Sequence, residues 1–110
     1  MKILISALGE GLEAKFSERF ARADYFVIYD TESDKVESEQ NEFKDGQSGV
    51  GVKVSQYIAD KGVNVVIAGD FGPKAYDTLK SLGIKMFLFK GATVKDALNG
   101  YKENKLEEKK

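Results

Sequence analysis

The spacing of hydrophobic residues along the chain predicts several buried strands. Consecutive apolar residues, many of them β-branched, fill positions 2–6, 25–30, 63–68 and 84–89, and such runs are typical of strands inside a sheet. The run at 63–68 is the most hydrophobic, so we expect it to be the central strand. Residues 35–43 alternate weakly and are strongly polar, which favours an exposed edge strand.

Other segments place apolar residues three or four positions apart, as one buried helix face requires. Three helices are therefore predicted, at residues 50–61, 74–81 and 94–101. Gly62 follows the first helix as a C-terminal stop, Pro73 suits the first position of the second, and Thr93 can cap the third.

The short segment 14–23 is predicted to form a helical turn. Phe16 and Phe20 stand four residues apart in it, a spacing that would put both rings on one helix face.

The order of these elements predicts an α/β fold. Residues 31–34 supply a turn between strands 25–30 and 35–43, which we expect to pair as an antiparallel hairpin. The later strands are joined through helices and are expected to be parallel. The result is a mixed five-stranded sheet covered by helices, in one domain over residues 1–102. Residues 103–110 mix charges without an apolar face and are predicted to be a disordered tail.

Composition narrows the classes of function. The 110 residues suit one domain, and the formal charge of −1 gives no overall attraction to nucleic acid or anionic membranes. No apolar run approaches the roughly 20 residues that cross a bilayer, and the first residues lack a signal-peptide cleavage pattern, so we expect a cytoplasmic protein. Abundant Lys and Glu with few Asn and Gln fit a thermophilic source, and fit ordinary sampling in a short chain equally well.

The chain has no cysteine and no histidine, which removes thiolate nucleophiles, histidine bases and the usual ligands of zinc and iron. A metal-dependent nuclease would also need an acidic residue on the first strand, and residues 2–6 have none. Residues Asp70 to Gly72 match the Asp-Phe-Gly motif of protein kinases. The chain is too short, however, to carry the Gly-rich loop, paired lysine and catalytic-loop aspartate that a kinase also needs. A magnesium-dependent phosphoester hydrolase using Asp70 is the third-ranked hypothesis.

Three loops carry candidate binding chemistry. The turn Gly69–Lys74 follows the central strand, where open α/β sheets bind ligands, and its free N–H groups can receive an anion. The glycine-rich linker Lys44–Gly51 precedes a helix in the same way. Arg19 and Arg22 are three residues apart and can clamp a carboxylate or phosphate. Each loop also has a structural interpretation without a ligand. The first can be an ordinary turn, the linker a mobile connector, and the two arginines a solvated pair.

Together these segments resemble the dinitrogenase iron–molybdenum cofactor biosynthesis family. The stretch SERFARADYFVIYDTES resembles that family's Ser-x-x-Phe-Gly-Arg-Ala motif, aromatic strand and Tyr-Asp pair. Residues 49–87 resemble its Gly-x-Gly helix, Gly-x-x-Gly-Pro turn and LKxxGIK segment, and GATVKDALNGYKENKL resembles its closing helix. The similarity extends over about residues 1–106.

The resemblance implies a ribonuclease H-like three-layer fold and a non-catalytic role. Members of the family bind iron–sulfur precursors or the iron–molybdenum cofactor and carry them, so metal-cluster assembly proteins are the implied partners of a monomer or weak homodimer. The chain departs from the family at Ala21, where a glycine is usual, and at Gln47 and Ser48, where many members have a histidine. An anionic cluster would therefore be held weakly, by shape and charge, since imidazole and thiolate are the expected ligands of such iron.

The candidate binding residues are Arg19, Arg22, Gln47, Ser48, Gly49, Gly51, Gly69, Gly72 and Lys74. No catalytic residue and no metal ligand is predicted. The alternative function is a regulatory or protein-interaction module that binds a small anion without a metal cluster.

Overall fold

The computed structural model describes residues 1–110 and contains six strands and three helices. In chain order these are β1 (Lys2–Ala7), β2 (Tyr25–Asp30), β3 (Val36–Gln40), α1 (Val50–Asp60), β4 (Val65–Ala68), α2 (Pro73–Ser81), β5 (Lys85–Leu88), α3 (Val94–Lys102) and β6 (Glu107–Glu108). None of the helices has the length and apolar composition that crossing a bilayer requires.

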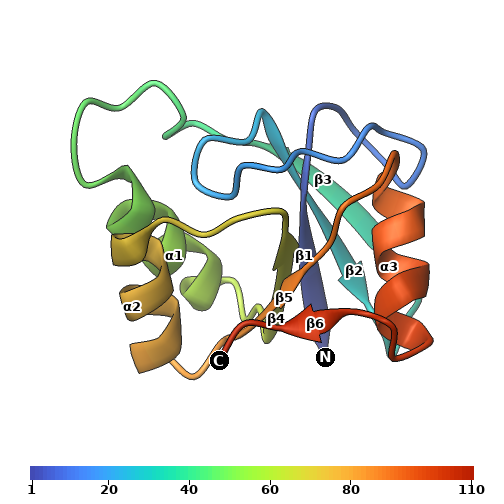
Figure 1. The fold of residues 1–110 in the computed structure, drawn as a ribbon. Helices are drawn as coiled ribbons and strands as arrows, with labels where there is room; N and C mark the ends of the chain where they lie inside the picture. Colours follow the sequence, from blue (N-terminus) through green and yellow to red (C-terminus); the bar gives the residue numbers. More distant parts are fainter.

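All six strands form one mixed sheet in the order β3-β2-β1-β4-β5-β6. The predicted hairpin of β2 and β3 is confirmed, and β2 also pairs antiparallel with β1. The predicted parallel part is confirmed too, because β4 pairs parallel with both β1 and β5. The carboxyl ends of these three parallel strands therefore meet at one edge of the sheet, the upper edge in Figure 1.

Helices cover both faces of the sheet (Figure 1). Successive strand residues point to opposite faces, so Leu4 and Val66 join the core beneath α1 and α2, whereas Ile3 and Val65 join the core beneath α3. Both cores consist mainly of apolar side chains, and the few buried polar residues include Ser6 of β1 and Ser55 of α1. This arrangement explains why the central strands read as continuous hydrophobic runs.

The helix ends follow the local signals in the sequence. Pro73 is the first residue of α2, where its missing N–H is not needed. The hydroxyl of Thr93 accepts a hydrogen bond of 3.1 Å from the amide of Asp96 and caps α3. Gly62, directly after α1, has a φ of 80°, a backbone conformation that favours glycine.

The prediction of five strands was wrong, because the C-terminal segment supplies a sixth. Glu107 and Glu108 pair antiparallel with β5, and the amide of Lys109 donates to the carbonyl of Met86 at 2.9 Å. Leu106 anchors this segment against Gly100, where even a methyl group would approach its side chain to 2.8 Å. The segment predicted to be a disordered tail thus contains a short edge strand, β6, at Glu107–Glu108. A single apolar residue holds this segment, which is too little for a periodic pattern to reveal.

The helical turn predicted at 14–23 is also absent; the segment forms turns and isolated bridges instead. Its two phenylalanines belong to different cores. Phe16 packs edge-on against Phe89 beneath α3, with 5.0 Å between the ring centroids, whereas Phe20 packs against Phe71 on the other face at 5.4 Å. A helix would have put both rings on one face, so burial on both sides of the sheet overrides the local spacing.

A charged cluster fastens edge strand β3 to α1. The Glu39 carboxylate accepts hydrogen bonds from the Tyr57 hydroxyl and the Lys61 ammonium group. Burial raises the pKa of Glu39, but the hydrogen bonds from Lys61 and Tyr57 outweigh that effect, and the net pKa lies below its ordinary value. A carboxyl whose pKa is lowered by folding stabilises the fold at neutral pH and loses that contribution as the pH falls through its folded pKa.

We therefore predict that Glu39→Gln weakens the acid dependence of stability. Between about pH 6 and about pH 3 the free energy of unfolding of the wild type should fall by about 1 kcal/mol more than that of the variant. Urea titrations across this range measure the difference. Glu37→Gln is the matched control, because Glu37 lies on the same strand and has no ion pair. Parallel curves for wild type and Glu39→Gln would contradict the prediction.

Candidate functional site

Three loops meet at the carboxyl edge of the parallel strands. They are the segment that follows β1 (residues 8–24), the linker between β3 and α1 (residues 41–49), and the turn between β4 and α2 (residues 69–72). In Figure 1 the first two loops cross the top of the molecule, and the turn from β4 to α2 lies below them beside the start of α1. The topology thus brings together the three loops that the sequence identified separately.

A cleft of about 620 Å³ opens where these loops meet the two helices. This volume is within the range of sites that hold small ligands. The residues that line it are Arg19, Phe20, Ala21, Arg22, Gln47, Ser48, Gly49, Val50, Gly51, Asp70, Gly72, Pro73, Lys74 and Ala75. Eight of the nine candidate residues from the sequence are among them, and Gly69 is the exception.

Two helix N-termini open into the cleft. Gly49 precedes α1 and Gly72 precedes α2, and neither helix has a side-chain cap. The first helical hydrogen bonds run from Lys53 to Gly49 and from Tyr76 to Gly72, so the amides before them have no acceptor in the protein. Free N–H groups and the positive end of each helix dipole both favour an anion here.

Gly51 allows the two helix N-termini to lie close together. A Cβ atom at this position would be 3.1 Å from the amide nitrogen of Ala75 and 3.2 Å from its Cβ. Any larger residue would push α1 away from α2. The Gly-x-Gly start of α1 therefore supplies a positive φ of 69° at Gly49 and a close helix contact at Gly51.

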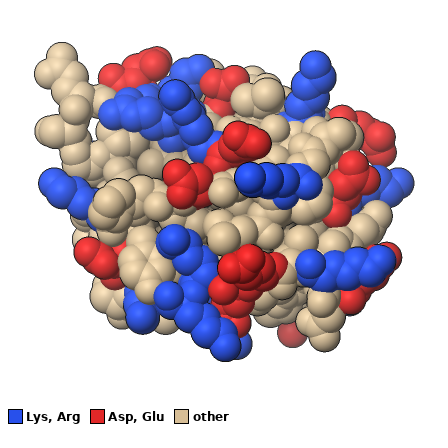
Figure 2. All heavy atoms as spheres, in the orientation of Figure 1, with Lys and Arg blue, Asp and Glu red and all other residues tan.

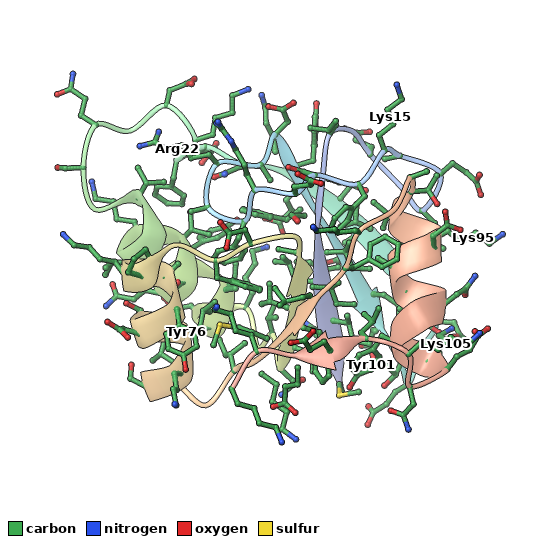
Figure 3. The ribbon with its side chains drawn as sticks, in the orientation of Figure 1. Lys15, Arg22, Tyr76, Lys95, Tyr101 and Lys105 are labelled. Carbon is green, nitrogen blue, oxygen red and sulfur yellow. The ribbon has the colours of Figure 1, made fainter.

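Basic side chains surround the opening. Arg19, Arg22 and Lys74 are exposed, and Figure 2 shows Lys and Arg side chains gathered over this corner of the molecule, at the upper left. Arg22, labelled in Figure 3, lies beside the linker and donates a hydrogen bond of 2.6 Å to the carbonyl of Lys44. One carboxylate, that of Asp70, also lines the cleft, and it accepts a hydrogen bond from the amide of Phe71.

Gly69 has a structural place behind the cleft. Its amide and that of Asp70 both donate to the carbonyl of Glu18, at 2.9 and 3.0 Å. A Cβ atom at Gly69 would lie 2.9 Å from the Cα of Glu18. The glycine thus lets the arginine-bearing loop approach the end of β4, and it does not line the cleft itself.

Sequence reasoning missed the residues that hold the loops in place. The side-chain amide of buried Asn41 donates to the carbonyls of Ala21 and Ala23, at 2.8 and 2.9 Å. Lys44 forms an ion pair with Asp24 at 2.5 Å, and that hydrogen bond raises the pKa of Lys44. Both contacts join the linker to the loop that carries the arginines. An asparagine at the end of a polar strand has no distinctive sequence signal, because its partners are backbone carbonyls.

Comparison with known proteins identifies the family. The sequence model of the family described as "dinitrogenase iron-molybdenum cofactor" matches residues 1–104. The chain belongs to this family. The resemblance inferred from the arginine motif and the Gly-x-x-Gly-Pro turn is thereby confirmed.

Solved structures agree with this assignment. A protein from Thermotoga, described as a NifB protein of the DUF35 family, is 43% identical with a TM-score of 0.87, and the alignment covers 97% of this chain and 91% of that one. The apo form of the orange protein from Desulfovibrio gigas is 30% identical with a TM-score of 0.93, over 98% of this chain and 92% of that one. A curated sequence relative, an uncharacterized protein of Methanocaldococcus jannaschii, is 31% identical over 84% of this chain and 81% of its own length.

We predict that Asn41→Ala loosens the arginine-bearing loop. The carbonyls of Ala21 and Ala23 would lose their hydrogen-bond donor, which should lower the free energy of unfolding by about 2 kcal/mol. Amide resonances of residues 19–24 should shift or broaden in the ¹H–¹⁵N spectrum. Asn99→Ala, on the exposed face of α3, is the control and should change stability by less than about 0.5 kcal/mol. Unchanged resonances over residues 19–24 in Asn41→Ala would show that Asn41 does not anchor this loop.

Proposed function

We propose that the protein is a non-catalytic carrier that holds an anionic metal–sulfur species in the cleft between α1 and α2. The observation that carries the proposal is the convergence of two uncapped helix N-termini with Arg19, Arg22 and Lys74 on one opening. Membership in a family described by the iron–molybdenum cofactor supports the choice of a metal–sulfur species as the cargo.

The residues around the cleft fit an anionic cluster that is held without direct metal ligands. The chain has no thiolate and no imidazole to bind iron. Backbone amides and guanidinium groups can instead donate hydrogen bonds to sulfide or carboxylate groups at the surface of the cargo. Because Arg19, Arg22 and Lys74 are exposed, the cargo would remain accessible to a donor or acceptor protein. Weak, exchangeable binding is what a carrier needs.

The composition of the cleft supports binding rather than catalysis. Asp70 is its one carboxylate, and no group of three or more carboxylates that could hold a metal ion occurs in the structure. A two-metal phosphoester hydrolase needs several such ligands around its reacting phosphate. With neither histidine nor cysteine in the chain, Asp70 also has no partner of those types for acid–base or nucleophilic work.

The second candidate function is a regulatory module that binds a small anion alone. The free amides of the two helices favour it, because they suit phosphate or a carboxylate as well as a cluster. Assembly-protein partners, a monomeric or weakly dimeric state, the ribonuclease H-like classification and a thermophilic source stay predictions from the sequence.

Anaerobic reconstitution with ferrous iron and sulfide tests the carrier function. We expect the wild type to retain a visible chromophore through gel filtration and to show shifted amide resonances at Gly49–Gly51 and at Gly72, Lys74 and Ala75. The double variant Arg19→Gln/Arg22→Gln should retain at least about tenfold less chromophore, because it loses two charge-assisted contacts.

A matched control keeps this result interpretable. Lys15→Gln/Lys95→Gln removes the same number of positive charges from residues outside the cleft, both labelled on the right of Figure 3, and should retain the wild-type chromophore. If no chromophore is retained but inorganic phosphate shifts the same amides, the anion-binding module is the correct function. If neither probe shifts them, both functions are wrong.

A further inference from the structure

A second basic surface lies at the opposite end of the parallel strands, where β5 begins. Lys80 near the end of α2, Lys85 at the start of β5, and Lys109 and Lys110 after β6 surround a hollow of about 290 Å³. We call it the lysine hollow. In Figure 2 a group of basic side chains lies low in the view, near the C-terminus shown in Figure 1. The cleft lies at the top of the same view, so the two surfaces are at opposite ends of the parallel strands.

None of the four lysines is paired with a carboxylate. The four ion pairs of the molecule involve Lys44, Lys61, Lys95 and Lys105 instead. Glu108 also lines the hollow, but no lysine nitrogen lies within ion-pair distance of it. Four like charges around one hollow repel one another, and an anionic occupant relieves that repulsion. This clustering occurs in a chain whose formal charge is −1, so it does not reflect a generally basic surface.

Two of these lysines are held in place by one aromatic ring. The ammonium groups of Lys80 and Lys109 lie 5.5 and 5.4 Å from the ring centroid of Tyr76, and Lys80 also donates to the Tyr76 hydroxyl at 3.3 Å. Tyr76, labelled in Figure 3, stands on α2 at the lower left of the view. Cation–π contacts limit the freedom of the long lysine side chains. The charges are thus positioned before any partner arrives, which lowers the entropy cost of binding.

We propose that the lysine hollow docks an extended acidic segment of a partner protein. The hollow adjoins β6, the outermost strand on its side of the sheet. In an extended segment alternate side chains point to the same side, so acidic residues at every second position can face the lysines together. A nucleic acid fits less well, because it needs a longer positive track than four lysines around one hollow supply. Docking here leaves the cleft open, so the partner can be bound while cargo enters or leaves.

This inference does not depend on the ligand of the cleft, and it is tested separately. The probe is a capped peptide in which four glutamates alternate with serines, titrated into the ¹⁵N-labelled full chain at low salt. We expect shifts at the amides of Lys80, Lys85 and Lys109, weakening steeply as salt is added. Amides of the cleft should stay unchanged.

The variants make the outcome decisive. Lys80→Gln/Lys109→Gln should weaken peptide binding at least about tenfold, because two positioned charges are lost. Lys15→Gln/Lys95→Gln carries the same change in net charge and should bind within about twofold of the wild type. Equal weakening in both variants would mean non-specific attraction and would overturn the proposal. Tighter binding of a single-stranded oligonucleotide than of the peptide would overturn it as well.

Lys80→Gln/Lys109→Gln should also retain the iron–sulfur chromophore of the wild type. Loss of peptide binding with a normal chromophore separates docking from the cleft. Loss of both in a folded variant would show that the two surfaces are one site, contrary to the proposal.

Discussion

The candidate site depends on one backbone contact. The carbonyl oxygen of Glu18 accepts hydrogen bonds from two neighbouring amides. Gly69 and Asp70 donate to that oxygen directly after the central strand ends. The contact fixes the loop of Arg19 and Arg22 to the most buried part of the sheet. It is possible only because position 69 has no side chain, since a Cβ atom there would overlap the backbone of Glu18. The buried strand β4 therefore determines where the exposed arginines lie.

The N-termini of α1 and α2 also depend on a glycine that permits close packing. Gly51 lets α1 approach Ala75 of α2, and the turn before each helix leaves its first amides uncapped. A helix end without a side-chain cap is less stable than one with a cap, and α3 with its Thr93 cap shows the alternative within the same chain. Two uncapped ends beside one cleft suit a ligand that supplies the missing acceptors. The weakness of these helix ends and the capacity to bind an anion have the same cause.

Much of the fold could be predicted because its signals are local. Hydrophobic runs marked the strands, and Pro73 and Thr93 marked helix starts, as found. The predictions were wrong where contacts between residues far apart in the sequence determine the local structure. Phe16 and Phe20 are spaced for a helix but are buried on opposite faces of the sheet, and the C-terminal strand rests on Leu106 packing under Gly100. The cleft was predictable to the extent that topology brings loops to one edge. The role of the buried Asn41 could not be predicted, because its side chain donates to backbone carbonyls about 20 residues away in the chain.

Positive charge is distributed unevenly over the molecule, and this distribution bears on function. The chain is nearly neutral overall, yet unpaired basic side chains gather at both ends of the parallel strands. At the carboxyl edge they accompany free helix amides, which suit a compact anion. At the opposite edge they accompany an aromatic ring and a short edge strand, which suit an extended acidic chain. A carrier must recognise its cargo and its partner at once without one blocking the other. Different chemistry at the two ends of the parallel strands would meet that requirement of the proposed carrier.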